Sequence, residues 1–222
     1  LKRYAAPKSW HIARKSTKYI TKPNPGAHSM EVGMSLGVVL RLLGQTATAR
    51  ETKKALMLQE VLVDGRRVRD PRFIVGLFDV ITIAKEHVVV LLDHLGRLAF
   101  RKIAADAAAK KVCRVDGKHP VKGGKLQLNL VDGRNILLEK DDYRVGDSVV
   151  LETPSQKIIS HIPLKEGAHI LLTGGRHVGS VGVVQSVADG VVTYVHGKDV
   201  LRTRPANTYA MPKEYHVLMH HE

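Results

Sequence analysis

Apolar positions recur at helical spacing from Leu36 onward. Leu36, Val39, Leu40 and Leu43 stand at i, i+3, i+4 and i+7, so they line one face of a 3.6-residue period. Gly44 follows them, and glycine at this place is a typical C-terminal stop. The pattern predicts one short amphipathic helix.

A second helix is expected directly afterwards. Thr48 and Glu51 form a capping box, in which the hydroxyl and the carboxylate satisfy unpaired amides of a helix start. The helix then runs to about Leu58, and Leu56 and Met57 are expected to turn toward the first helix. Its cations share one face, since they stand at i, i+3 and i+4; they are Arg50, Lys53 and Lys54.

The next elements are strands. Residues 60–69 predict a hairpin around Asp64-Gly65, because this dipeptide supplies the positive φ angles of a tight primed turn. A further strand is expected at 80–83, so that this module closes near Ala84.

Beyond residue 84 the chain is rich in short apolar runs, which predict a mostly-β middle domain that ends near Pro163. One Ala-rich stretch at 104–111 interrupts it with one or two helical turns. The expected strands are 88–92, 97–103, 125–130, 135–138, 148–151 and 157–162.

The last part is a glycine-punctuated β unit. Apolar runs at 168–173 and 180–184 bracket a loop that begins with Gly174-Gly175, and strands at 191–195 and 199–203 extend the unit. A loosely packed tail is expected at 211–222.

The first 35 residues have the composition of a basic arm. They carry seven Lys or Arg residues before the first acid, Glu31, and the sole tryptophan of the chain, Trp10. Such a segment buries little apolar surface, so on its own it should be disordered or only partly ordered. It is either a solvated tail or an arm that orders against RNA, with Trp10 stacking on a base or capping the adjacent domain.

Charge narrows the class of partner. The net charge of +14 and the pI of about 10.0 favour a polyanion, either nucleic acid or an anionic surface. No apolar run reaches the roughly 20 residues of a spanning helix, and no signal peptide is recognisable, so a soluble intracellular protein without membrane contact is expected. Cys113 is the sole cysteine; it excludes an intrachain disulfide and a multi-cysteine zinc site, and it is either strand packing or a reactive thiol.

Catalytic constellations are not found in the sequence. There is no phosphate-binding Gly-x-x-x-x-Gly-Lys loop, and Asp141-Asp142 is typical of a solvated turn. His216 and His220 would share a helix face, but the glutamate of a metalloprotease helix is missing. We therefore expect no enzyme, no cofactor, no metal site and no small-molecule substrate.

The helix pair with its cationic second helix and the Asp-Gly-Arg hairpin resembles the RNA-binding domain of bacterial ribosomal protein S-four, the alpha-L motif. Residues 167–186 resemble a KOW unit whose fixed central glycine is Gly182. Together with the arm, this order of modules is similar to the S-four-e family of small-subunit ribosomal proteins. The sequence departs from that family at Arg176-His177-Val178, where an Asn-containing loop is expected, and it shows no basic extension after Pro212, which favours the archaeal type.

The resemblance implies an α+β, multi-module fold and a set of boundaries. These are an arm at 1–35, an alpha-L domain at 36–84, a central β-rich domain at 85–163, an SH3-like β-barrel with the KOW unit at 164–210, and a tail at 211–222.

The resemblance also implies a structural role in the small ribosomal subunit, in the cytoplasm, with ribosomal RNA and neighbouring ribosomal proteins as partners. Two alternatives remain open: an RNA-modifying enzyme, and a transient transcription or translation factor. Four glycines are expected to be structural, namely Gly65, Gly174, Gly175 and Gly182. The residues expected to contact RNA are Lys2, Arg3, Lys8, Trp10, His11, Arg14, Lys15, Lys18, Arg50, Lys53, Lys54, Arg66, Arg67, Arg69, Arg72, Arg176, His177, Lys198 and Arg202.

Overall fold

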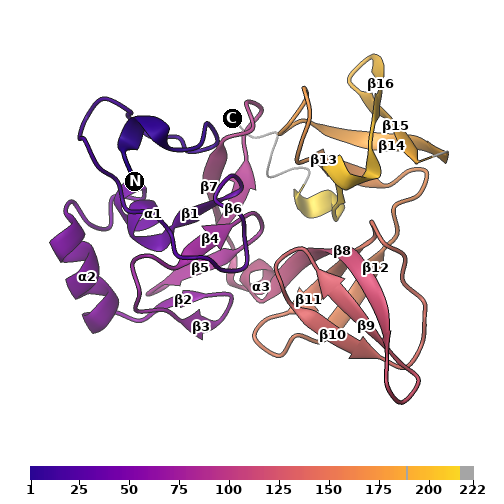
Figure 1. The fold of residues 1–222 in the computed structure, drawn as a ribbon, viewed down its shortest axis with the longest axis horizontal. Coiled ribbons are helices and arrows are strands. Elements are labelled where there is room, and N and C mark those ends of the chain that lie inside the picture. Colours follow the sequence, from indigo (N-terminus) through magenta and orange to yellow (C-terminus); the bar gives the residue numbers. More distant parts are fainter. Residues whose placement is uncertain (189, 216–222) are drawn as a thin grey trace. The chain divides into compact units, whose positions relative to one another are not determined.

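The computed structural model describes residues 1–188 and 190–215, and the chain divides into two compact units. Unit 1 comprises residues 1–91, 97–111 and 153–155, and the remaining residues form unit 2. The described part is mostly β with few helices, in several separate sheets (Figure 1).

Unit 1 combines a helix pair with a five-stranded sheet of order β3-β2-β5-β6-β7. A short pair, β1 with β4, completes it. Its elements are the 3-10 helix η1 Arg3–Ala5, β1 Gly33–Ser35, α1 Leu36–Leu42, α2 Ala49–Leu58, β2 Val61–Val63, β3 Arg66–Arg67, β4 Ile74–Gly76, β5 Val80–Ile83, β6 Glu86–Leu92, β7 Leu98–Ile103 and α3 Ala105–Ala108.

The helix predictions follow from local chemistry and are confirmed. The Thr48 hydroxyl accepts from the Glu51 amide, the Glu51 carboxylate accepts from the Thr48 amide, and Gly44 follows α1 with φ of +73°. Leu56 is fully buried, but Met57 is 57% exposed, so its expected packing against the first helix is wrong. Consecutive helical residues point about 100° apart, and only one of the two can face α1.

The boundary expected near residue 84 falls inside the sheet of unit 1. A tight turn at Ala84-Lys85 joins β5 to β6, and Ile83 pairs with Glu86 across it. Strands 88–92 and 97–103, assigned to the middle domain, therefore complete this sheet. The turn carries no glycine; Ala84 itself adopts φ of +53°.

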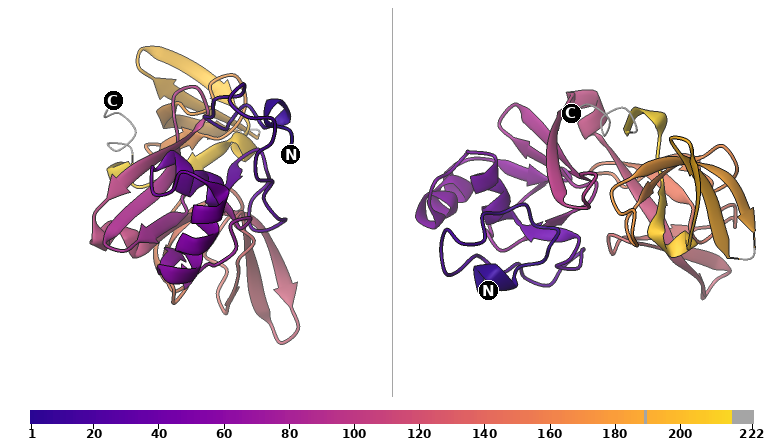
Figure 2. Two further views of the ribbon diagram at one scale, coloured as in Figure 1. Left: turned by 90° about the vertical axis from the view of Figure 1, so that its left-hand side faces the viewer. Right: turned by 90° about the horizontal axis from the view of Figure 1, so that it is seen from above.

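The arm is folded onto unit 1, so the expectation of disorder is corrected. Its start pairs with its middle: Arg3 donates its amide to the Lys18 carbonyl, and Ile20 donates its amide to the Leu1 carbonyl. Trp10 is 2% exposed, and its indole nitrogen donates to the carbonyls of Met30 and Gly33. The indigo arm lies against the helices and strands of unit 1 in both views of Figure 2.

Unit 2 holds two antiparallel five-stranded sheets, of order β10-β9-β8-β11-β12 and β16-β15-β14-β13-β17. Their cores centre on Val115, Leu128 and Val149 and on Ile170, Val192 and Tyr194. The strands are β8 Lys110–Val121, β9 Lys125–Leu130, β10 Asn135–Leu138, β11 Ser148–Glu152, β12 Ile158–Ile162, β13 His169–Leu172, β14 Val181–Ala188, β15 Val191–His196, β16 Asp199–Thr203 and β17 Thr208–Ala210, with the 3-10 turn η2 Pro205–Asn207 before β17.

Two expectations for these residues are corrected. Lys110 and Lys111 begin the long strand β8 instead of ending a helix, and the polar residues and Pro120 within β8 conceal it in the sequence. The tail is not loosely packed at its start, since Met211 is 2% and Tyr215 6% exposed. Residues 216–222, with His216 and His220, lie outside the described residues.

Candidate nucleic-acid interface

Helix α2 presents the predicted cationic face. Arg50, Lys53 and Lys54 are all exposed, and none has an ion-pair partner within the described part of the chain. The neighbouring acid, Glu51, uses its carboxylate in the helix cap, where it accepts hydrogen bonds from the amides of Ala47 and Thr48. These hydrogen bonds lower the pKa of Glu51. The cations of this face are therefore not neutralised by the helix itself.

The hairpin continues directly from this helix. Asp64 and Gly65 adopt φ of +50° and +74°, as the primed turn requires. Arg66 and Arg67 face Val63 and Leu62 in the β2–β3 register, and both are exposed. Two further exposed cations follow at Arg69 and Arg72. Only Gln59 and Glu60 separate the hairpin from α2, so both basic surfaces belong to one structural unit. We call these seven cations the helix–hairpin face.

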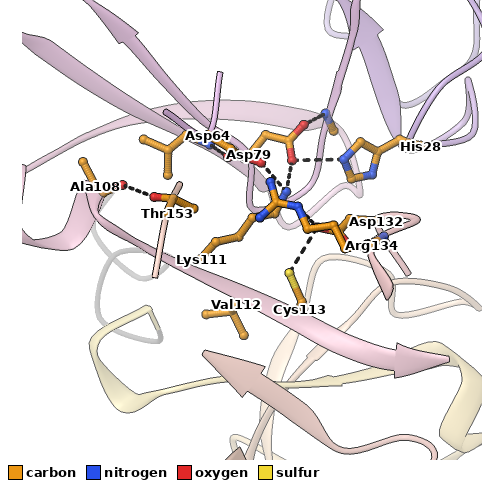
Figure 3. A network of polar contacts seen from close by, with 12 residues as sticks. His28, Asp64, Asp79, Ala108, Lys111, Val112, Cys113, Asp132, Arg134 and Thr153 are labelled. Atoms are coloured by element: carbon orange, nitrogen blue, oxygen red, sulfur yellow. Dashed lines mark hydrogen bonds and ion pairs between the residues drawn. The ribbon is translucent and has the colours of Figure 1, made fainter. Parts of the chain in front are cut away.

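A buried ion cluster supports the hairpin turn (Figure 3). The Lys111 ammonium lies 2.6 Å from Asp64 Oδ2 and 2.5 Å from Asp79 Oδ1, and His28 Nε2 lies 3.0 Å from the same Asp79 oxygen. Asp64 Oδ1 also accepts from the Val80 amide, which ties the turn to β5. The four side chains are at most 6% exposed.

The pKa values of the two carboxyls in this cluster are shifted in opposite directions. Burial and the negative charge of Asp79 raise the pKa of Asp64. Burial would also raise the pKa of Asp79, but the charges of Lys111 and His28 outweigh it and hold that pKa well below its usual range. Sequence reasoning missed the cluster, because nothing local distinguishes Lys111 from an exposed lysine.

Some cations of the arm form hydrogen bonds within the arm, and others are exposed to solvent. The Arg14 guanidinium donates to the carbonyls of Tyr4, Ala6 and Pro7 at 2.8–3.2 Å, and Arg3 donates to Ala13 at 3.0 Å. These two arginines hold the arm in shape. Of the RNA contacts expected in the arm, those with exposed side chains are Lys2, Lys8, His11, Lys15 and Lys18.

Trp10 has to be removed from the expected RNA contacts. At 2% exposure its ring has no free face for a base, and its one polar atom is already bonded. Trp10 instead has the other role expected for it, which is packing against the adjacent domain.

In unit 2 the loop that begins with Gly174-Gly175 lines a basic hollow of about 410 Å³. Its lining brings together Arg176 and His177 of the loop with Arg202 of β16, as well as Arg204, which sequence reasoning missed. Lys198, in the β15–β16 turn, is not among its lining residues. Arg204 stands two residues after Arg202, and this alternation along an extended segment is the signal that could have found it.

The glycines of this unit have distinct steric reasons. A Cβ on Gly174 would lie 2.8 Å from Asn207 Oδ1, and Gly175 has φ of +87°. Gly182 lies close to the neighbouring strand β15, so that a Cβ there would lie 2.7 Å from the Tyr194 side chain and 2.7 Å from the Val195 carbonyl. The loop and the sheet both require backbone without a side chain at these places.

Among residues 1–188 and 190–215 no group of three or more His, Cys, Asp or Glu side chains could hold a metal ion. No helix of the described residues is long and apolar enough to cross a membrane.

Comparisons with known proteins agree on one family. The model of the ribosomal family S4e matches residues 84–158, and that of the RS4NT (NUC023) domain matches residues 1–31. The small ribosomal subunit protein eS4 of Methanococcus aeolicus is 44% identical over 190 residues, covering 81% of this chain and 77% of that protein. The protein of the same name from Methanothermobacter thermautotrophicus is 38% identical over 218 residues, or 97% of this chain and 89% of its own.

A solved structure agrees with these sequences. The crystal structure of the 30S ribosomal protein S4e from Thermoplasma acidophilum has a TM-score of 0.71 and 27% identity. The match covers 81% of this chain and 94% of that one.

Proposed function

Because the chain belongs to the ribosomal S4e family, we propose that it is a structural constituent of the small ribosomal subunit, in the cytoplasm, which binds folded ribosomal RNA. Its partners are then ribosomal RNA and neighbouring ribosomal proteins. It acts without catalysing a reaction: its cationic surfaces neutralise phosphates of separate RNA segments and hold them in one arrangement.

One observation carries the proposal. Seven exposed cations lie on α2, on the hairpin and on the segment that follows it, and within the described residues none of them has an ion-pair partner. Unpaired cations on a rigid surface suit phosphate binding, since each phosphate contact releases a condensed counterion. The turn is fixed by the buried Lys111–Asp64 pair, so little ordering entropy is lost when RNA docks.

The module assignments belong to the same proposal. The α1–α2 pair with the β2–β3 hairpin corresponds to an alpha-L domain, and the β13–β17 sheet corresponds to a small SH3-like barrel with a KOW unit around Gly182. The hollow beside Gly174-Gly175 is then a second RNA contact, through Arg176, His177 and Arg202, and Lys198 contacts RNA separately.

Sedimentation tests this function. The tagged chain, expressed in a host that carries an S4e protein, should migrate with small subunits in a sucrose gradient and stay there after a high-salt wash. A triple variant of the hairpin arginines 66, 67 and 69 to Ala should wash off at lower salt. A control triple variant, Lys85→Ala, Lys122→Ala and Lys125→Ala, removes the same charge from exposed sites elsewhere and should remain bound.

Other outcomes point to the alternatives. A chain that stays in the light fractions would remove the structural role and favour an RNA-modifying enzyme, which an assay for modified nucleotides would then detect. Substoichiometric association that is lost in the wash would favour a transient factor.

A further inference from the structure

A second basic hollow lies in unit 1, between the arm and the helix pair, and of the helix–hairpin face only Arg72 lines it. Its volume is about 420 Å³, within the roughly 300–1,000 Å³ of sites that hold a small ligand. Its walls are Leu1 and arm residues 19–22, helix α1, the start of α2, and Pro71 with Arg72. We call it the arm pocket.

The walls of the arm pocket are held by hydrogen bonds to the rest of unit 1. Ile20 donates its amide to Leu1, and the Ser35 hydroxyl donates to the Thr21 carbonyl at 3.2 Å. On the opposite wall the Gly37 amide donates to Pro71 at 2.9 Å, and the Asn24 amide donates to Arg72 at 2.8 Å. The pocket is thus preorganised, and a ligand pays little to order it.

Three cations line the arm pocket, and among the described residues no acid does; the cations are Lys22, Arg41 and Arg72. Arg41 is half-buried, and its guanidinium donates to neutral acceptors, the Gly37 carbonyl at 3.0 Å and the Thr21 hydroxyl at 3.5 Å. Burial and the nearby charge of Arg3 lower the pKa of Arg41. A partly buried guanidinium on neutral acceptors favours binding of an anion with several acceptor oxygens.

An aromatic ring stands in the same lining. Tyr19 is 61% exposed although its neighbour Ile20 is buried, and the Lys18 ammonium lies 5.5 Å from the Tyr19 ring centroid. Exposed rings beside cations serve as stacking platforms for bases of single-stranded nucleic acid. The pocket therefore offers both parts that a nucleotide needs, a cationic place for phosphate and a face for the base.

We propose that the arm pocket holds one unstacked nucleotide of RNA, with its phosphate between Arg41 and Arg72 and its base against Tyr19. This inference rests on the proposed RNA-binding function and adds a contact that shares only Arg72 with the helix–hairpin face. It also assigns the folded arm a specific role: by pairing residues 1–3 with 18–20, the arm builds one wall of a binding site.

Mononucleotide titration of the full chain tests the pocket independently of the ribosome. AMP added to isotopically labelled protein should produce saturable shifts of the amide signals of residues 19–22. Adenosine and inorganic phosphate, added separately, should each bind at least ten-fold more weakly than AMP. Equal binding of phosphate and AMP would overturn the base contact at Tyr19, and the absence of saturable shifts at 19–22 would overturn the pocket.

Variants localise the effect. Arg72→Gln, at an exposed side chain whose hydrogen bonds here run through its backbone, should weaken AMP binding at least five-fold without loss of the fold. Tyr19→Leu should weaken AMP binding but not phosphate binding. Lys85→Gln removes the same charge from the β5–β6 turn and should leave the titration unchanged. An unaltered AMP affinity in Arg72→Gln and in Arg41→Gln would exclude the phosphate position.

The two proposals fail separately. If AMP leaves residues 19–22 unperturbed while the chain still sediments with small subunits, only the arm pocket is wrong. If AMP binds as described but the chain does not join small subunits, the ribosomal function is wrong and the nucleotide site stands.

Discussion

The ammonium of Lys111 lies 2.6 Å from a carboxylate oxygen of Asp64, across 47 residues of sequence. Asp64 occupies the turn of the arginine hairpin, and Lys111 stands at the start of β8. Both side chains are buried, so the ion pair anchors the turn that presents Arg66 and Arg67. The RNA-binding surface that we propose thus depends on a residue that never touches RNA.

Replacing Lys111 with Met should destabilise unit 1 by about 3–5 kcal/mol, because it removes a buried cation that pairs with two neighbouring carboxylates. Chemical denaturation monitored by circular dichroism measures the loss. Lys110→Met, at the exposed neighbour in the same strand, is the matched control and should change stability by less than about 0.5 kcal/mol. A Lys111→Met protein that unfolds at the wild-type denaturant concentration would show that the cluster contributes nothing.

The pH dependence of stability should differ between the two carboxyls of this cluster. The pKa of Asp79 is depressed, so its contribution is present above its unfolded-state pKa of about 3.9 and is lost as pH falls. Asp79→Asn should therefore cost about 3–5 kcal/mol at pH 7, and the difference from wild type should narrow below about pH 4.

The contribution of Asp64 to stability changes with pH in the opposite direction, because the pKa of Asp64 is raised. Its contribution is present below about pH 3.9 and is lost as pH rises through the folded-state pKa. The stability of Asp64→Asn relative to wild type should then improve as pH rises above about 4. Denaturation curves at pH 3 to 7 test both signs, and parallel pH profiles for the two variants would contradict this assignment.

Removing the hairpin arginines should change the salt dependence of RNA binding as well as its strength. If Arg66, Arg67 and Arg69 each neutralise one phosphate, their joint replacement by Ala should reduce the slope of log K against log salt by about 2 to 3. Filter binding to small-subunit ribosomal RNA at several salt concentrations gives this slope. Weaker binding with an unchanged slope would mean that the arginines position the surface without meeting phosphates.

Trp10 should report the folding of the arm. As the sole tryptophan, and a buried one, it should emit at short wavelength in the native chain and shift to the red as the arm unfolds. Trp10→Ala should cost about 3–5 kcal/mol through the cavity it leaves, and Trp10→Phe about 1–3 kcal/mol, since two carbonyls lose their donor. Native emission at the wavelength of free tryptophan would contradict the packed arm.

Local chemistry determined much of this protein from the sequence alone. The capping box at Thr48, the stop at Gly44 and the Asp64-Gly65 turn act over a few residues, so their helix and hairpin follow from adjacent side chains. Net charge and the cations at helical spacing likewise indicated a nucleic-acid surface, because both are properties of the residues along the chain. These features do not depend on where the rest of the chain lies.

Only the tertiary structure decided which of these residues are buried and which distant ones meet. Trp10 and Lys111 look like accessible residues of a basic segment, yet Trp10 is buried within unit 1 and Lys111 pairs with two buried carboxylates. Arg41 and Arg72 stand 31 residues apart, and only the packing of residues 71–73 against α1 brings them to one hollow. Burial and long-range charge pairing depend on the sum of contacts across the fold, and no pattern of neighbouring residues encodes that sum.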